Sequence, residues 1–177
     1  RCIKNQNRSI KNLRSFMVSH KIEYYPYKDD KYFSHEKREQ YFNDVEPSFL
    51  NESVILIDPD NGFEVKSMRS GNGHKYLKYN ELSEVYGRMS SNSLVLVYQH
   101  IPRVKREDHF AQVGQRIRRF INTRNPICLT DNSIAFFITA KTDALLDRTW
   151  AVLTNYAKEN GYKVYRCDDD FGMESGF

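Results

Sequence analysis

The run Val54-Ile55-Leu56-Ile57-Asp58-Pro59-Asp60-Asn61-Gly62 joins four consecutive apolar residues to a polar turn. An apolar tetrad rich in β-branched residues is typical of a strand, and Pro59 and Gly62 mark the place where that strand ends. A second run, Leu94-Val95-Leu96-Val97-Tyr98, repeats the pattern and is followed by the polar pair Gln99 and His100. Because neither run alternates with polar residues, we expect both strands to be buried on two faces.

Outside these two strands, the apolar spacing switches regularly between helical and extended periods, which is typical of a parallel sheet with crossover helices. Helical spacing predicts helices over residues 10–17, 34–45, 82–89, 110–121 and 146–157, the last ending at Gly161. Extended spacing predicts further strands over residues 22–27, 134–138 and 162–165. We therefore expect an α/β fold, a three-layer α/β/α sandwich with a mainly parallel, Rossmann-like sheet. Residues 1–167 are predicted to form a single α/β domain, and residues 168–177 an acidic, mobile tail.

The composition is 40% apolar and 28% charged, with 27 Lys and Arg against 23 Asp and Glu, which excludes a disordered or collagen-like chain. No apolar run approaches the roughly 20 residues that cross a bilayer, and no signal-peptide pattern opens the chain. We therefore expect a cytoplasmic protein without a membrane partner. Cys2, Cys128 and Cys167 lack the spacing of a disulfide framework or a zinc site, and the five histidines show no ligand motif, so no metal site is predicted from them.

Polar residues follow both buried strands, and in open parallel sheets ligands bind beyond the carboxyl ends of the strands. The candidate site is therefore made of Asp58, Pro59, Asp60 and Asn61 after the first strand, and of Gln99 and His100 after the second. An ordinary turn is the alternative for the first group, and side chains that satisfy strand-end backbone groups are the alternative for the second. Asp58 favours a functional interpretation, because a carboxylate at the end of an apolar strand must be hydrogen-bonded or used if it is buried.

The arrangement of a buried strand ending in Asp-Pro, a crossover helix and a second buried strand resembles the second half of class I S-adenosylmethionine-dependent methyltransferases. Asp58-Pro59-Asp60-Asn61 is similar to a divergent form of their fourth motif, Asp/Asn-Pro-Pro-aromatic, over a region of about residues 54–166. The resemblance implies that Asp58 accepts a hydrogen bond from the amine to be methylated and that Pro59 shapes the turn. Asp60 replaces the second proline, Asn61 replaces the aromatic residue, and Phe63 is the nearest ring.

S-adenosylmethionine is the cofactor that the resemblance implies. The family binds it with a glycine-rich loop after the first strand, because only glycine lets the backbone approach the cofactor closely. Residues 1–61 contain no glycine, and the chain begins at Arg1. We therefore expect the cofactor loop to lie upstream of Arg1; the alternative is that the fold is kept and cofactor binding is lost.

A second chemistry fits some of the same residues. Residues 54–58 and 63–67 can be drawn as a hairpin that turns at residues 59–62, with Asp58 on one strand and Glu64 and Lys66 on the other. This is how Asp/Glu-x-Lys nucleases bind Mg²⁺ and activate water, with carboxylates as hard oxygen ligands and lysine near the attacking oxygen. A solvated alternation of charge is the alternative for Glu64 and Lys66.

Charge indicates nucleic acid as a partner. Between Arg103 and Arg124 the chain has seven basic residues and two acidic ones. We expect a phosphate-binding stripe formed by Arg103, Lys105, Arg106, Arg116 and Arg119, with a solvated helix face as the alternative. The sequence thus predicts a methyltransferase-like protein that acts on an amine of a nucleic acid. The alternatives are the Mg²⁺-dependent nuclease and a non-catalytic module that binds nucleic acid or protein on a degenerate fold.

Overall fold

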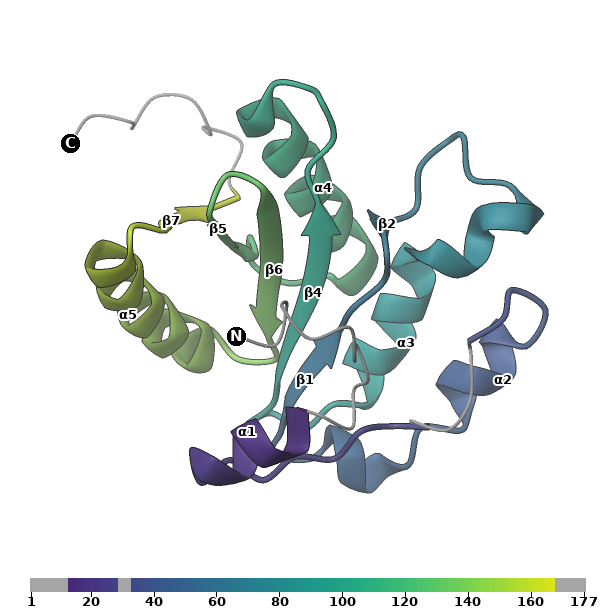
Figure 1. Cartoon of the computed structure of the whole chain (residues 1–177), viewed down its shortest axis with the longest axis horizontal. Coiled ribbons are helices and arrows are strands. Elements are labelled where there is room, and N and C mark those ends of the chain that lie inside the picture. Colours follow the sequence, from purple (N-terminus) through teal and green to yellow (C-terminus); the bar gives the residue numbers. More distant parts are fainter. Residues whose placement is uncertain (1–12, 29–32, 168–177) are drawn as a thin grey trace. The chain divides into compact units, whose positions relative to one another are not determined.

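A computed structural model of the chain describes residues 13–28 and 33–167, and its contacts divide the chain into two compact units, Arg1–Ser34 and His35–Phe177 (Figure 1). In the described part of the first unit, α1 (Leu13–Ser19) has no buried residue. The predicted strand over residues 22–27 is wrong, because none of the described residues pairs with this segment. The start of the predicted helix at residue 10 and the predicted tail 168–177 lie outside the described residues, and the single domain over 1–167 stays a prediction.

The second unit contains a five-stranded sheet in the order β1-β4-β6-β5-β7. Its strands are β1 (Val54–Ile57), β4 (Leu94–His100), β5 (Ile127–Thr130), β6 (Ile134–Ala140) and β7 (Lys163–Arg166). β1 and β4 are parallel, whereas the pairings β4-β6, β6-β5 and β5-β7 are antiparallel. The predicted α/β class is confirmed, but the mainly parallel sheet is wrong. Only residues 131–133 connect β5 to β6, which is too short for the crossover that parallel strands require.

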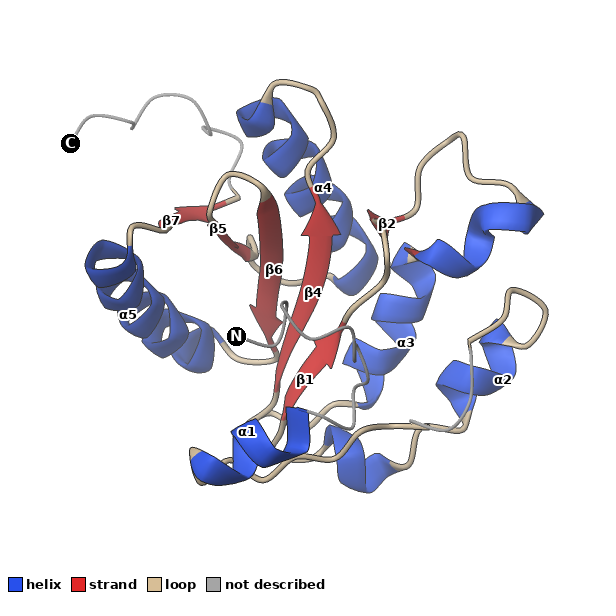
Figure 2. Cartoon of the chain, viewed as in Figure 1, coloured by secondary structure: helices blue, strands red, loops and turns tan. Residues whose placement is uncertain are grey.

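Helices pack on both faces of this sheet (Figure 2). Phe110 of α4 (Arg106–Ile121) contacts Phe137 of β6 on one face, with ring centroids 6.2 Å apart, and α3 (Tyr79–Arg88) packs beside α4. Leu146 of α5 (Asp143–Asn160) packs with Ile127 and Ile138 on the other face. Phe137 and Ile138 are consecutive in β6, so their side chains point to opposite faces. Among the described residues, no helix combines the length and apolar character needed to cross a membrane.

The boundaries of α5 follow from capping residues. Thr142 precedes the helix, and its hydroxyl oxygen accepts a hydrogen bond from the Leu145 amide at 3.4 Å. Gly161, predicted to end the helix, adopts a φ of +72°, a conformation that glycine reaches without the steric cost of a Cβ atom. α4 ends in the same way at Asn122, with a φ of +46°.

β1 lies at the edge of the five-stranded sheet, and within the described residues it pairs only with β4. Val54 and Leu56 are 68% and 55% exposed, so the expectation that this strand is buried on both faces is wrong. β4, in contrast, has a strand on each side, and its Val95 and Val97 are fully buried. The two apolar runs that look alike in the sequence therefore have different surroundings.

The residues after β1 do not fold back on that strand. β2 (Gly62–Phe63) pairs in parallel with β3 (Tyr76–Leu77), so the predicted hairpin between residues 54–58 and 63–67 is wrong. The Asn61 amide donates to the Lys75 carbonyl at 3.0 Å, and the Glu64 amide donates to the Leu77 carbonyl at 2.8 Å. These bonds use the backbone groups that a hairpin would need.

A buried ion pair joins the short helix α2 (Arg38–Asn43) to α3. Arg38 and Glu81 are 5% and 4% exposed, and an Nη atom of Arg38 donates to Oε2 of Glu81 at 2.9 Å. The same guanidinium donates to the carbonyls of Gly73, at 2.9 Å, and Tyr76, at 2.8 Å. Gly73 belongs to the 3₁₀ helix η4 (Ser70–Lys75), whereas a second 3₁₀ helix, η3 (Pro47–Leu50), precedes β1. Because buried charges must be paired, this cluster fixes the segment between β2 and α3.

Candidate functional site

The ends of β1 and β4 meet at one edge of the sheet. The two strands are parallel, and Ile57 lies opposite Val97, so that Asp58 leaves β1 at the level of Tyr98 in β4. Parallel strands present their carboxyl ends at the same edge, which is where ligands bind in open α/β sheets. The structure thus places the Asp58 turn beside the end of β4, as the sequence predicts.

Asp58 is exposed, but neighbouring protein atoms displace part of the water around its carboxylate. Desolvation raises the pKa of Asp58 above its usual range, and the negative charge of Asp60 raises it further. Desolvation also raises the pKa of Tyr98, with added contributions from the charges of Asp58 and Asp131. The Asp58 carboxylate can therefore accept a hydrogen bond from a neutral or cationic donor and gains stability when it does.

Gln99 holds the turn of residues 58–62 (the Asp58 turn) through hydrogen bonds to the backbone in and directly after it, instead of lining a pocket. Its side chain is buried, with 4% exposure, and its Oε1 accepts a hydrogen bond from the Phe63 amide at 2.9 Å. Its Nε2 donates to the carbonyls of His100, at 2.7 Å, and Asn61, at 3.4 Å. Gly62, with a φ of +94°, is pressed against this amide: an added Cβ atom would lie 2.3 Å from Gln99 Oε1. The prediction that Gln99 binds substrate is therefore replaced by a structural role.

The other predicted residues of the turn differ in exposure. Asp60 and His100 are exposed, whereas Pro59 and Asn61 are half-buried. The Asn61 carbonyl and amide are both used in holding the turn, through the bonds to Gln99 and Lys75. Asp58 and Asp60 are therefore the side chains of this turn that are open to a ligand.

The residues of the alternative nuclease site have different partners. Oε1 of Glu64 accepts a hydrogen bond from the Tyr79 amide at 2.9 Å and so caps the first turn of α3. Lys66 is exposed on the segment that follows β2. Within residues 13–28 and 33–167, no group of three or more His, Cys, Asp or Glu side chains is placed to bind a metal ion.

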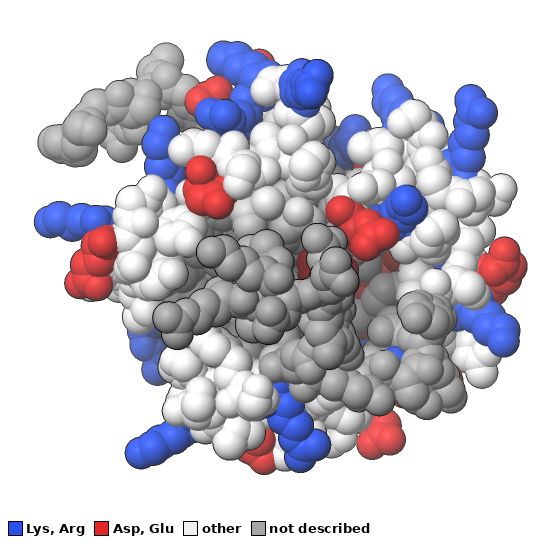
Figure 3. Space-filling view, viewed as in Figure 1, with Lys and Arg blue, Asp and Glu red and all other residues white. Residues whose placement is uncertain are grey.

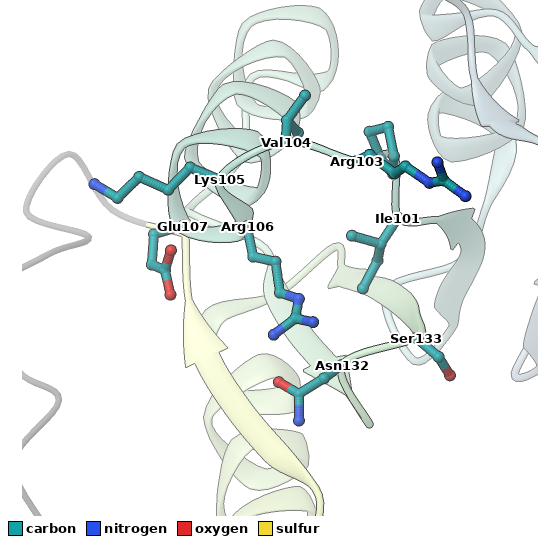
Figure 4. Close-up of a pocket in the computed structure, with 9 residues that line it drawn as sticks. Ile101, Arg103, Val104, Lys105, Arg106, Glu107, Asn132 and Ser133 are labelled. Carbon is teal, nitrogen blue, oxygen red and sulfur yellow. The ribbon is translucent and has the colours of Figure 1, made fainter.

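An open hollow of about 640 Å³ lies at the turn between β4 and α4. Three of the basic residues predicted to bind substrate, Arg103, Lys105 and Arg106, line it together with Asn132 of the β5-β6 turn. Figure 4 shows Arg106 and Asn132 extending toward each other across the hollow, whereas Lys105 and Arg103 extend to either side of it. In Figure 3, basic side chains also gather at the end of the molecule where α4 begins. With Glu107 as its acidic lining residue against these three basic ones, the hollow has an excess of positive charge that attracts a phosphate group.

Arg116 and Arg119 lie farther along α4 and do not join this hollow. The Arg116 guanidinium lies 5.9 Å from the ring centroid of Tyr79 at the start of α3, whereas Arg119 lines a second hollow of about 460 Å³. Thirteen residues separate Arg106 from Arg119, which corresponds to about 20 Å along a helix. The predicted stripe is thus divided: Arg103, Lys105 and Arg106 lie at the turn before α4 and at its start, whereas Arg116 and Arg119 lie in the second half of the helix.

No protein family, curated protein or solved structure matches the chain. The function is therefore inferred from the geometry and chemistry of the site.

Three aromatic residues near the site were not singled out in the sequence. Tyr98 adjoins Asp58, and Tyr79 and Phe120 form a stack with Phe63 directly after the turn. The signal for Tyr98 is its position opposite the first residue after β1 in a parallel pair. For Phe120 the signal is its position four residues after Arg116, on the same side of α4.

Proposed function

We propose that the second unit is the acceptor-binding part of a methyltransferase-like protein that acts on an amine of a nucleic acid. The observation that supports this proposal best is the position of Asp58, which directly follows β1 and lies beside Tyr98 of the parallel strand β4. α3 is the crossover helix between these two parallel strands, and this connection supports the proposal, whereas β1 is an edge strand and not the buried strand of the resemblance.

The described residues do not fit S-adenosylmethionine, the cofactor that the resemblance implies. Residues 1–61 contain no glycine, and the described residues before β1 form α1, α2 and η3 but no strand. β1 is itself an edge strand, so no described neighbour carries a glycine-rich loop to its carboxyl end. The proposal therefore concerns only the binding and orientation of the acceptor by this chain's own residues.

In this proposal Asp58 accepts a hydrogen bond from the exocyclic amine of an unpaired base. A carboxylate accepts but does not donate hydrogen bonds when it is ionised, so it favours an amine over a carbonyl at the same position. Because the pKa of Asp58 is raised by desolvation and by Asp60, an N–H donor relieves an unfavourable charge. The hollow at Arg103, Lys105 and Arg106 lies at the exit of β4, the strand beside β1, and is suited to a backbone phosphate of the same strand.

The test measures binding of fluorescent single-stranded oligonucleotides that differ at one base. One pair compares adenine with hypoxanthine, and the other compares cytosine with uracil, so that an amine is replaced by a carbonyl. Wild-type protein should bind the amine-bearing member about tenfold more tightly, the effect of one charge-assisted hydrogen bond. Asp58→Ala should abolish this preference, and Asp58→Asn, which keeps an acceptor oxygen, should retain part of it.

A matched control is Glu159→Ala, which removes an exposed carboxylate from α5 and should leave the preference unchanged. Equal binding of the amine and carbonyl oligonucleotides by the wild-type protein would refute the role of Asp58. The same conclusion follows if Asp58→Ala keeps the full preference.

The misfit with S-adenosylmethionine favours a second candidate, a non-catalytic nucleic-acid-binding module on the same fold. In that case Asp58→Ala leaves binding intact, whereas charge reversal at Arg116 and Arg119 abolishes it. Loss of affinity in the charge-reversal variant, with no preference for amines in the wild type, would support the binding module over the acceptor site.

A further inference from the structure

Three aromatic rings form a column that runs from the Asp58 turn to the surface. Phe63 stacks on Tyr79 with centroids 4.6 Å apart and planes 6° apart, and Tyr79 stacks on Phe120 at 5.4 Å and 24°. Phe63 and Tyr79 are 2% and 3% exposed, whereas Phe120 is 45% exposed. The first two rings are therefore anchored in the core, and the third presents aromatic surface to solvent.

The position of Phe120 is fixed by contacts on two helices. The Ser83 hydroxyl of α3 donates to the Phe120 carbonyl at 2.9 Å, and α3 packs beside α4 along this side. The buried Tyr79 ring supports Phe120 from within, and desolvation raises the pKa of Tyr79 to about 12, so its hydroxyl stays neutral. The backbone at Phe120 is thus anchored to α3 and its ring stacks on a buried ring, which lowers the entropic cost of binding to it.

Two basic residues lie near Phe120 in the sequence of α4. Arg116 precedes Phe120 by one helical turn, and its guanidinium lies 5.9 Å from the centroid of Tyr79 in the same column. Arg119 is the adjacent residue and is exposed. An exposed ring with Arg116 on the same side of α4, and with Arg119 at the neighbouring position of the helix, combines a surface for stacking with charges that attract phosphate.

We propose that Phe120 is a stacking platform for an unpaired base of a single-stranded nucleic acid, whose phosphates lie against Arg116 and Arg119. Proteins that bind single strands combine aromatic rings, on which bases stack, with a basic surface that follows the backbone. A duplex keeps its base faces stacked on each other, so a platform of this kind selects unpaired strands. This inference rests on the proposed nucleic-acid partner but not on the role of Asp58.

α5 offers a matched comparison. Tyr156 is 44% exposed and stacks on Tyr162 with centroids 5.5 Å apart, so its exposure and ring contact resemble those of Phe120. The residues one turn before and after it are Val152, Leu153, Glu159 and Asn160, none of which is basic. Tyr156 therefore has no basic residue one turn away on its helix, and we expect it not to contribute to binding of nucleic acid.

The experiment measures the affinity of the full chain for a fluorescent 20-nucleotide single strand of mixed sequence and for the corresponding duplex. Phe120→Ala should weaken single-strand binding about tenfold, in the range that removal of one base-stacking ring produces. Phe120→Leu fills the contact with Tyr79 but has no aromatic face, so it should be as weak as Phe120→Ala, whereas Phe120→Trp should restore affinity. Tyr156→Ala should bind like the wild type.

The charged part of the platform is tested by salt dependence. Replacing Arg116 and Arg119 with alanine should lower the slope of log affinity against log salt by about 1.4, since each phosphate contact to a single strand contributes about 0.7. Wild-type affinity for Phe120→Leu would overturn the proposal, as would equal affinity of the wild type for single strand and duplex. If Phe120→Leu loses affinity while Asp58→Ala keeps the amine preference unchanged, the platform stands and the role of Asp58 fails.

Discussion

Gln99 should determine the stability of the Asp58 turn, and Gln99→Leu tests this. The substitution introduces an apolar side chain of similar size and removes the acceptor of the amide of Phe63, a residue that is 2% exposed. A buried amide left without a partner costs about 1–3 kcal/mol. The carbonyls of His100 and Asn61 also lose their donor. We therefore expect the free energy of unfolding to fall by about 2 kcal/mol and the melting temperature by roughly 4–8 °C for a chain of this size.

A double-mutant cycle with Gly62 separates the contact from the backbone strain. Gly62→Ala places a Cβ atom 2.3 Å from Gln99 Oε1, and the hydrogen-bonded amide cannot move away without losing its partners. In the Gln99→Ala background that clash is absent, and only the cost of an alanine at a φ of +94° remains. Urea unfolding followed by circular dichroism should show a double variant at least about 1 kcal/mol more stable than the sum of the single changes predicts. Additivity within about 0.5 kcal/mol, or a Gln99→Leu effect below that value, would refute the supporting role of Gln99.

Three further changes give expected outcomes in urea unfolding. Arg38→Met leaves the buried Glu81 carboxylate without its cationic partner, with the hydrogen bond from the Lys78 amide remaining, and should cost about 3–5 kcal/mol. Adding Glu81→Gln should recover part of that loss, which a role in packing alone would not allow. Asp58→Asn should stabilise the fold at pH 7, because the pKa of Asp58 is raised in the folded state. The wild type therefore loses stability as the pH rises from 3.8 through the folded pKa, and the difference in stability between the two proteins should vanish below pH 3.8. Gly114→Ala should destabilise by about 1–3 kcal/mol, because its Cβ atom would lie 2.3 Å from the Cβ atom of a buried cysteine, whereas Gly87→Ala, with open space around it, should not destabilise α3.

The helices and central strands could be predicted from apolar spacing, because their periodicity is long enough to be unambiguous. The strand predicted over residues 94–98 extends to residue 100, and the helix predicted over 146–157 extends over residues 143–160. The missing residues are polar ends that carry no hydrophobic signal. Thr142 could have marked the start of α5, since threonine before a helix caps it.

The direction of the strands could not be predicted, because one strand was not recognised. Residues 127–130 form a four-residue apolar segment after Pro126, which is too short to show a period. If β5 is not recognised, residues 134–138 follow a predicted helix directly, which is the pattern of a parallel sheet. The turn residues Asp131, Asn132 and Ser133 were the available signal, because a polar connection of three residues between two apolar runs favours a hairpin.

The candidate site could be located from the sequence but not divided into supporting and exposed residues. The sequence predicts that Gln99 lines a pocket, because it follows a buried strand. Gln99 is, however, two residues after Val97 and four after Val95, both of which are fully buried. Side chains two residues apart in a strand point to the same face, so this spacing predicts that Gln99 is buried. The sequence does not show on which face of the sheet each helix packs, so it does not show which face of β4 is the more deeply buried one.

The same alternation explains how the turn can be rigid and accessible at once. Leu56 and Asp58 are two residues apart along β1 and its continuation, so they point to the same face of the sheet. Leu96 and Tyr98, their neighbours in β4, point to this face too, which is the face opposite Gln99. On the Gln99 side, the buried amide is hydrogen-bonded to the backbone of Asn61 and Phe63 in and after the turn and to the carbonyl of His100 in β4. On the opposite side, Leu56 is 55% exposed and Asp58 is exposed, with the Tyr98 phenol close enough to sense its charge. Changes at Gln99 therefore act on the position of the turn, whereas changes at Asp58 act on what the turn can bind, and this separation lets stability and recognition be measured independently.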